Sequence, residues 1–130
     1  MQDSIFTKII RGELPSHKVY EDDQTLAFLS IYPSTEGHTL VIPKKQVDQL
    51  WDLDDATYQA VMRTTQKVAV RLKEVLATER VGLKVIGLDV PHAHVHLTPF
   101  TDAAEYYAKE TKDEPDHETL AALAARLWFT

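Results

Sequence analysis

The chain has 130 residues, a formal net charge of -6 at pH 7, 44% hydrophobic and 26% charged residues, and no cysteine. The absence of cysteine excludes disulfides and thiolate metal sites, and the acidic balance argues against the broad basic surface of a nucleic-acid-binding protein. No run approaches the ~20 apolar residues of a membrane span and no signal peptide is evident, so we expect one cytoplasmic domain over residues 1–130, without a membrane partner.

The first half of the chain predicts a short helix and three strands. An apolar side with Asp3 or Ser4 as capping residue favours the helix, and turn residues between two apolar runs favour a hairpin. The expected ranges are residues 4–11 for the helix and residues 18–21, 25–31 and 38–43 for the strands.

The second half predicts two helices and two strands. Apolar residues at three- and four-residue steps indicate each helix, and acidic or hydroxyl residues precede them as caps. The expected elements are a helix from Asp52 or Asp54 to about Ala77, strands over residues 82–87 and 91–99, a polar surface loop over residues 102–115 and a helix capped by Asp116 or Thr119. Because the strands come in groups, this order predicts an α+β domain: a five-stranded antiparallel sheet with helices on one face.

Three histidines at strict two-residue spacing, His92, His94 and His96, are the most informative feature of the chain. In a β-strand, residues i, i+2 and i+4 lie on one face, so the imidazoles would form a row roughly 7 Å apart. The apolar residues between them would pack on the other face. We expect the helices to cover that apolar face and to leave the histidine face open.

A row of three histidines allows three interpretations. It can be a half-exposed polar face, although three histidines in register between two prolines are seldom a matter of chance. It can bind a metal, but three residues on one extended strand cover roughly 13 Å and need bending or a further ligand to reach one ion. It can also hold a nucleophile, because a neutral imidazole attacks electrophilic phosphorus while its neighbours hold phosphate oxygens.

Several blocks of the sequence resemble the histidine triad (HIT) superfamily of nucleotide hydrolases and transferases. They are residues 4–16 (SIFTKIIRGELPS), 19–23 (VYEDD) with 26–28 (LAF), 37–44 (GHTLVIPK) and 92–97 (HAHVHL). The blocks follow the order that they have in the family.

This resemblance implies a homodimer whose sheets join into one continuous ten-stranded sheet, with a purine-nucleotide pocket in each subunit and no cofactor. It implies that His94 attacks the α-phosphorus and carries a transient nucleotidyl group, which water releases as a nucleoside monophosphate. His92 and His96 would orient the nucleophile and contact phosphate, and His38 would complete the hydrogen-bonded set. The base and ribose pocket would draw on Ile5, Phe6, Ile9, Phe28, Ser30 and Ile31.

Some residues depart from the family pattern. Ser30 stands where many relatives carry an acidic residue that holds the ribose hydroxyls, and serine cannot offer a charged grip. Before the triad the turn is short: Leu88 cannot hydrogen-bond a leaving group, and Asp89 would lie at the substrate and repel phosphate unless it is turned away. These departures keep a second hypothesis open, a purine-nucleotide-binding module with weak or lost catalysis.

Some relatives bind structural zinc through an N-terminal cysteine pair and a later histidine. Those places hold Ser4, Thr7 and Gln46 here, so we expect no such zinc and no metal in the site. The leading hypothesis is therefore a metal-independent nucleotide phosphoramidase or hydrolase. The leaving group and the choice between adenine and guanine stay open.

Overall fold

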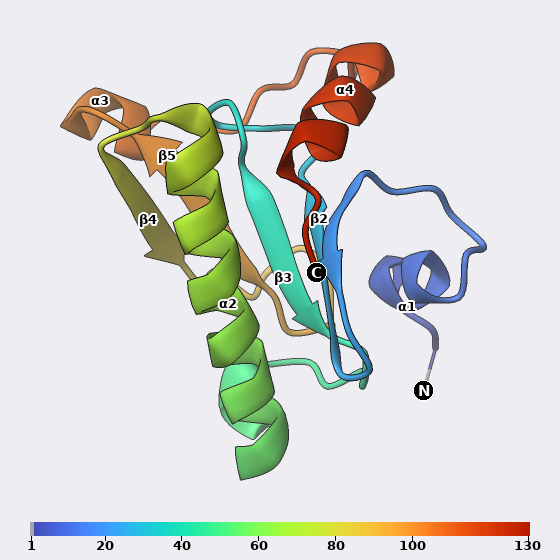
Figure 1. The fold of residues 1–130 in the computed structure, drawn as a ribbon. Helices are drawn as coiled ribbons and strands as arrows, with labels where there is room; N and C mark the ends of the chain where they lie inside the picture. The colour runs from blue at the N-terminus through green and yellow to red at the C-terminus, as the bar shows by residue number, and fades with distance from the viewer. Residues whose placement is uncertain (1) are drawn as a thin grey trace.

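Five strands form one antiparallel sheet in the order β1-β2-β3-β5-β4. The structure is a computed structural model that describes residues 2–130. The strands are β1 (Lys18–Glu21), β2 (Thr25–Leu29), β3 (Thr39–Pro43), β4 (Arg80–Lys84) and β5 (Val95–Phe100). The helices are α1 (Ile5–Ile10), α2 (Asp55–Leu76), α3 (Ala103–Tyr106) and α4 (His117–Leu127), with a 3-10 helix η1 (Leu50–Asp52) before α2 (Figure 1). The predicted α+β class and five-stranded antiparallel sheet are confirmed.

Side-chain caps begin the α-helices. Ser4, Asp54 and Asp116 each accept a hydrogen bond from the backbone N–H three residues later, at the start of α1, α2 and α4. Asp102 does the same for α3 and forms a reciprocal capping box with Glu105. The expected polar loop in that part of the chain therefore contains a short helix, because the capping box stabilises one turn without any apolar periodicity.

The helices α2 and α4 cover one face of the sheet. Their apolar residues share a core cluster with alternate residues of β2, β3 and β5, among them Ala27, Val41 and Val95. Val68 and Leu72 of α2 are fully buried there, and each such side chain contributes about 1.5–3 kcal/mol through removal from water. Within residues 2–130, no helix is both long and apolar enough to cross a lipid bilayer.

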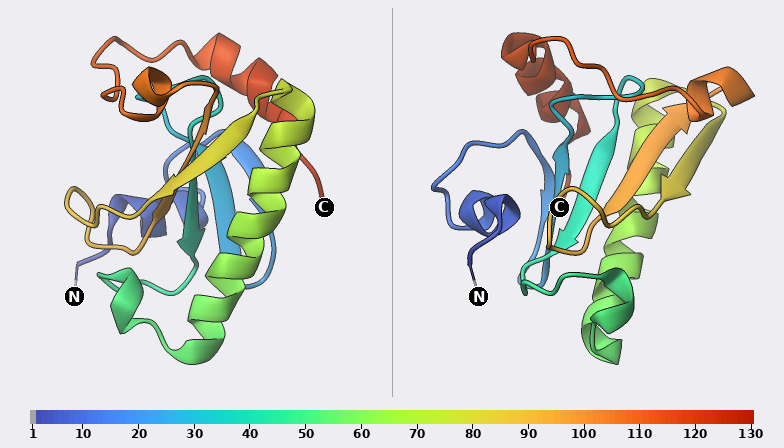
Figure 2. Two further views of the ribbon diagram at one scale, coloured as in Figure 1. Left: turned by 90° about the vertical axis from the view of Figure 1, so that its left-hand side faces the viewer. Right: turned by 180° about the vertical axis from the view of Figure 1, so that it is seen from behind.

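The helix α1 packs on the opposite face, which corrects the expectation that all helices lie on one side. Phe6 of α1 is buried with Phe28, Leu40 and Ile42 in a second core cluster. Figure 2 (left) shows α1 and α2 on opposite sides of the sheet. In β3, Val41 points to α2 while its two neighbours point to α1, so both faces of the strand are apolar and both need a cover.

The histidine strand is shorter than the sequence predicts. β5 begins at Val95, so only His96 of the three histidines lies in the regular strand. In the segment before it, the N–H of Ala93 donates to the carbonyl of Val47 at 2.7 Å, so the chain pairs there with the loop after β3. The strand expected over residues 82–87 also ends earlier, because β4 covers Arg80–Lys84.

Candidate active site

Four histidines lie together on the α1 face of the sheet. His92, His94 and His96 come from β5 and the segment before it, and His38 directly precedes the neighbouring strand β3. Ring centroids are 5.1 Å apart for His94 and His96, and 5.2 Å apart for His38 and His96. Phe6 packs edge-on against the rings of His92 and His94. The imidazoles therefore share one face, although two of them precede the regular strand.

Backbone carbonyls determine which nitrogen carries the proton in His92 and His94. Nδ1 of His94 lies 2.8 Å from the carbonyl oxygen of His92, and Nε2 of His92 lies 2.8 Å from the carbonyl oxygen of Pro43. A carbonyl oxygen only accepts, so each of these two ring nitrogens carries a hydrogen. In neutral His94, Nε2 therefore keeps its lone pair, as a nucleophile requires.

A hydrogen bond links His38 to His96. Nε2 of His38 lies 2.9 Å from Nδ1 of His96. The backbone N–H of Ser34 donates to Nδ1 of His38 at 3.1 Å, so Nε2 is the nitrogen that carries the hydrogen and donates to His96. His96 therefore accepts at Nδ1, and its Nε2–H is available to donate to a ligand.

Burial keeps these rings neutral. Burial lowers the pKa of His38 to about 3, and the charges of His96 and Lys84 add to the shift. Burial likewise lowers the pKa of His96 to about 4, against the opposing charge of Asp89. The pKa of His92 is also lowered, again mainly by burial. These three rings are therefore uncharged near pH 7, the state in which each has one donor and one acceptor nitrogen.

A cavity of about 230 Å³ opens beside His94 and His96. All seven side chains that the sequence analysis assigned to the substrate line it: Ile5, Phe6, Ile9, Phe28, Ser30, Ile31 and Asp89. His38 and His92 are not among its lining residues; the ring of His38 contacts His96, and the backbone carbonyl of His92 contacts His94. Apolar walls with a few polar groups at one end are typical of a small-ligand pocket.

Glu110 lines the same cavity, and no sequence signal indicates it. Its Oε1 lies 3.9 Å from Nδ1 of His96, too far for a hydrogen bond. It comes from the loop after α3, and Figure 2 (left) shows α3 on the α1 side of the sheet. The N–H of Thr111 donates to the carbonyl of Pro33 at 3.1 Å, which ties this loop to the segment before β3.

Lys84 is a second residue that the sequence analysis missed. The pairing of β4 with β5 sets Lys84 opposite His96, so the two side chains share a face. Its Nζ donates to the carbonyl of Tyr106 at 2.6 Å and lies 4.5 Å from the centre of that ring. Its charge contributes to the lowered pKa of His38 and His96. Only the strand register could have indicated it.

One group within residues 2–130 has donor atoms close enough to suggest a metal site. The donor atoms of His38, His96 and Glu110 all lie within 4.8 Å of one another. The hydrogen bond from the Ser34 N–H to Nδ1 of His38 requires a proton on Nε2, and a protonated nitrogen does not bind a metal. The group therefore fits a hydrogen-bonded relay better than a metal centre.

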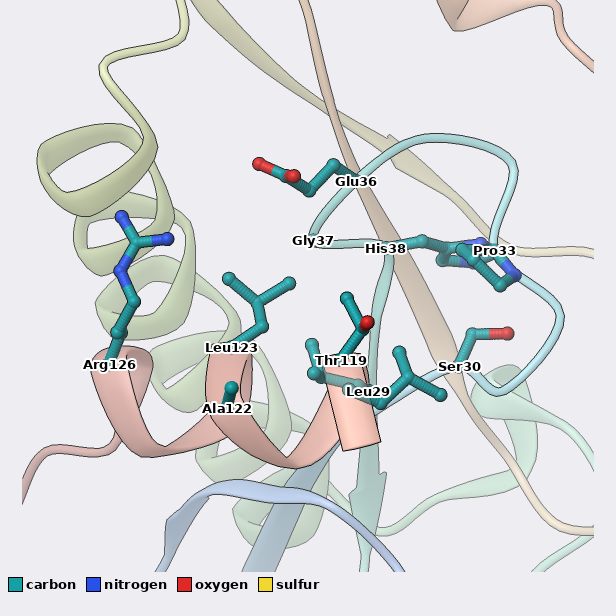
Figure 3. A pocket seen from close by; sticks show the side chains of 11 residues that line it. Leu29, Ser30, Pro33, Glu36, Gly37, His38, Thr119, Ala122, Leu123 and Arg126 are labelled. Carbon is teal, nitrogen blue, oxygen red and sulfur yellow. The ribbon is translucent and has the colours of Figure 1, made fainter. Parts of the chain in front are cut away.

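A second cavity, of about 350 Å³, lies between α4 and the turn before β3. Figure 3 shows Leu123 near its middle, with Arg126 and the ring of His38 toward opposite ends. Neither His94 nor His96 lines it. The candidate active site is therefore the smaller cavity, which brings a nucleophile and a hydrogen-bond donor together.

A family model described as a HIT domain matches residues 11–102. This chain belongs to the HIT family. The resemblance carried by the sequence blocks is thereby confirmed.

Curated relatives of this HIT chain include an enzyme. The chain is 43% identical over 106 residues to an uncharacterized HIT-like protein of Borreliella burgdorferi, covering 76% of each protein. It is 39% identical over 101 residues to the adenosine 5'-monophosphoramidase HNT1 of Saccharomyces cerevisiae, covering 75% of this chain and 63% of that enzyme.

Solved HIT structures share the fold over nearly the whole chain. A Hit-like protein involved in cell-cycle regulation from Bartonella henselae superposes with a TM-score of 0.86 and 34% identity, covering 96% of this chain and 93% of that one. A Zn-bound histidine triad family protein from Mycobacterium smegmatis superposes with a TM-score of 0.76 and 28% identity, covering 95% and 94%. The sheet and helices described above are therefore the HIT fold.

Proposed function

We propose that this HIT chain hydrolyses a purine nucleoside phosphoramidate or a dinucleoside polyphosphate at the α-phosphorus, through a nucleotidyl group carried by His94. The proposal rests on the geometry of that ring. The His92 carbonyl holds its Nδ1–H at 2.8 Å, so the opposite nitrogen keeps its lone pair, and the ring lines the 230 Å³ cavity. The activity in the name of the yeast relative supports the same reaction class.

The proposed reaction consists of two displacements at phosphorus. First, Nε2 of His94 forms a bond to the α-phosphorus while the bond to the leaving group breaks; a phosphoramidate that is protonated on nitrogen releases a neutral amine, and a dinucleoside polyphosphate releases a phosphate anion. A water molecule then displaces His94 and releases the nucleoside monophosphate. In both steps, Nε2–H of His96 donates to a phosphate oxygen whose charge grows in the transition state.

The apolar half of the cavity suits a purine base and its ribose. Apolar side chains offer van der Waals contacts to a base, namely those of Ile5, Phe6, Ile9 and Phe28. Ser30 replaces a carboxylate near the ribose, and its hydroxyl already accepts the Tyr32 N–H at 3.3 Å. Ribose hydroxyls are therefore held weakly in this proposal.

Two carboxylates favour an amine leaving group over a polyphosphate. Asp89 and Glu110 line the cavity near His96. The negative charge of Asp89 partly offsets the lowering of the pKa of His96, and Oε1 of Glu110 lies 3.9 Å from Nδ1 of His96. Negative charges attract a protonated amine and repel a second run of phosphates. We therefore rank nucleoside phosphoramidates first among the substrates.

The test is turnover with a chelator of divalent metals present. Adenosine 5'-phosphoramidate and diadenosine triphosphate are each incubated with the protein, and AMP release is followed by chromatography. His94→Ala should lower kcat/KM by at least about 10³-fold, because it removes the nucleophile. His117→Ala, at an exposed histidine of α4, is the control and should keep activity. Full activity in His94→Ala would refute the proposal.

A second candidate is a nucleotide-binding module with weak or lost catalysis. Leu88, in the turn before the triad, is exposed and apolar, so it offers no hydrogen bond to a leaving group. Asp89, the next residue, lines the cavity and carries a negative charge, which repels phosphate. Calorimetry with AMP, run beside the turnover assay, separates the two: binding without turnover supports the module.

We also propose a homodimer in which two β4 edges pair and the sheets join into ten strands. Within residues 2–130, β4 has a neighbour on one side only. The edge strand β1 is partly covered, because Phe129 N–H donates to the Val19 carbonyl at 3.2 Å. Leu83 of β4 and the nearby Ile86 are exposed apolar residues that a second copy would cover.

Sedimentation velocity tests this assembly. The protein should sediment as a dimer, and Leu83→Asp should sediment as a monomer because the charge lies at the paired edge. Val70→Asp changes another exposed apolar residue, on α2, and should stay dimeric. A monomeric parent protein at micromolar concentration would contradict the proposal.

A further inference from the structure

A buried polar network joins the start of α1 to the first histidine of the triad. Ser4 Oγ lies 2.8 Å from His92 Nδ1, and Thr7 Oγ1 lies 3.4 Å from the same atom. Gln46, in the loop after β3, accepts from the Ser4 backbone N–H at 2.9 Å and from the Thr7 hydroxyl at 2.5 Å. Ser4, Thr7 and His92 are buried, so water competes little for the bonds among them, whereas the bonds to Gln46 are partly buried.

The donor and the acceptor can be assigned for each hydrogen bond of His92 and Ser4. The Pro43 carbonyl accepts from Nε2 of His92, so Nδ1 carries no hydrogen and must accept. The Ser4 hydroxyl is therefore its donor, while the Ser4 oxygen accepts the Thr7 backbone N–H at 3.0 Å as the cap of α1. One hydroxyl thus caps the helix and donates to the bare Nδ1 of His92, the tautomer that the Pro43 carbonyl favours.

The network does not fit a zinc ion. It occupies the positions where the family resemblance expects a cysteine pair and a histidine in zinc-binding relatives, and one structural neighbour is described as Zn-bound. Here the donors are two hydroxyls, one amide oxygen and one imidazole, with no thiolate or carboxylate among them. Zinc in proteins prefers thiolate, imidazole and carboxylate ligands.

We propose that this hydrogen-bond network replaces a structural metal, and that Ser4 is a positioning residue that acts on His94 through His92. The His92 ring is held on both sides, by the Ser4 hydroxyl and by the Pro43 carbonyl. Its own carbonyl, in turn, accepts the Nδ1–H of His94 at 2.8 Å. The catalytic part of this proposal rests on the proposed function, whereas the tautomer of His92 does not.

The same network also sets the wall of the cavity. Because Ser4 caps α1 and Gln46 binds the Ser4 backbone, they fix the helix that presents Ile5, Phe6 and Ile9 to the cavity. The nucleotide wall and the nucleophile are therefore anchored by one set of hydrogen bonds.

Two variants separate the hydroxyl donor from the helix cap. Ser4→Asp keeps a capping oxygen but can only accept, so His92 Nδ1 loses its donor and gains a hydrogen instead. Ser4→Thr keeps the donor and should behave like the parent. Long-range ¹H–¹⁵N NMR of the imidazoles reports the tautomer directly. It should show a bare Nδ1 on His92 in the parent and in Ser4→Thr, and a protonated Nδ1 in Ser4→Asp.

Kinetics follow from the same variants. Ser4→Asp and Ser4→Ala should lower kcat for phosphoramidate hydrolysis by about 10–100-fold, the usual cost of losing an outer partner of a catalytic histidine. Asp54→Ala removes the cap of α2 and is the control: it should change neither the His92 tautomer nor kcat. A bare Nδ1 on His92 in a folded Ser4→Asp, or the kcat of the parent in a folded Ser4→Ala, would overturn the proposal. NMR needs no substrate, so it tests the role of Ser4 even if the protein does not hydrolyse phosphoramidates. Failure of the proposed function can therefore be distinguished from failure of this inference.

A triple variant tests whether the side chains converge on one point. Ser4→Cys, Thr7→Cys and Gln46→His together would supply two thiolates and an imidazole around His92 Nδ1, a ligand set that zinc prefers. Elemental analysis should find one zinc per chain in this variant and none in the parent. Zinc bound by the parent, or absent from a folded triple variant, would overturn the proposal.

Discussion

Three of the four imidazoles of the site have the position of their proton set by a backbone group with a single hydrogen-bonding role. The carbonyls of Pro43 and His92 only accept, and the backbone N–H of Ser34 only donates. The tautomers of His38, His92 and His94 are therefore set by backbone groups rather than by ligands. The outcome is a bare nitrogen on His94 next to an N–H on His96, the pair that attack at phosphorus requires.

We predict that His38→Ala weakens catalysis more than binding. The substitution removes the donor to Nδ1 of His96, so that ring no longer has to present Nε2–H to the cavity. We expect kcat to fall about 10–100-fold, with the Kd for AMP from calorimetry changed less than about threefold, since His38 does not line the cavity. The exposed His17→Ala is the control. An equal loss in kcat and affinity would contradict this account.

The loop after α3 is the element that brings charge to the cavity. Its Glu110 is the substrate-facing residue that lies farthest along the chain, and it lies beside His96 because the loop is tied to the Pro33 carbonyl. The short helix α3, which is capped by Asp102, directly precedes this loop. In the proposed function, we therefore expect leaving-group selection to depend on Glu110 of this loop, together with Asp89, rather than on the triad.

Glu110→Gln should shift selectivity toward anionic leaving groups. Removing one partly exposed charge changes the energy of a nearby charge by about 1 kcal/mol, or about fivefold in kcat/KM. The ratio of kcat/KM for diadenosine triphosphate to that for a phosphoramidate of a diamine should rise by this factor. Glu114→Gln, an exposed residue of the same loop, should leave the ratio unchanged. An unchanged ratio in Glu110→Gln would remove the argument for amine leaving groups.

The packing of α3 on β4 depends on a glycine, Gly82, beside the ring of Tyr106. A Cβ at Gly82 would lie 2.3 Å from a ring carbon of Tyr106, so this glycine provides room rather than an unusual backbone. Gly82→Ala should lower the free energy of unfolding in urea by about 1–3 kcal/mol, as overpacking usually does. The double variant with Tyr106→Ala should recover part of this loss, and purely additive effects would argue against the contact.

The histidines of the site are buried and neutral in the folded protein, so the free energy of unfolding decreases in acid. The folded pKa of His38 is about 3 and that of His96 about 4, against 6.5 for an exposed histidine, because burial disfavours the charged ring. Between these values the unfolded chain binds more protons than the folded one. The stabilisation is therefore complete above pH 6.5 and is lost as the pH falls toward the folded pKa.

Urea unfolding at pH 7.5 and pH 5 measures this effect. Each of the two rings should cost about 2 kcal/mol of stability at pH 5 relative to pH 7.5. His38→Asn removes one such ring and should flatten the pH dependence. The double variant His17→Asn with His117→Asn changes a histidine pair outside the site and should keep most of the pH dependence of the parent. Equal slopes for the parent and His38→Asn would contradict the burial argument.

The helix starts, the main helices and strands, the family and the expected substrate residues were predictable from the amino-acid sequence. Caps such as Ser4, Asp54 and Asp116 act on N–H groups three residues away, and apolar periodicity is a property of one segment, so both are readable without a fold. The family blocks added the expected substrate residues, and all seven line one cavity.

The hydrogen-bond partners of the histidines and the charges beside them became visible only in the folded chain. Glu110 and Lys84 reach the histidines through a loop contact and a strand register that no local pattern encodes. The partner of His96 comes from 58 residues away, and the partner of the His92 ring from 88 residues away. A ring's tautomer depends on which group faces each nitrogen, and that is known only when distant segments are brought together.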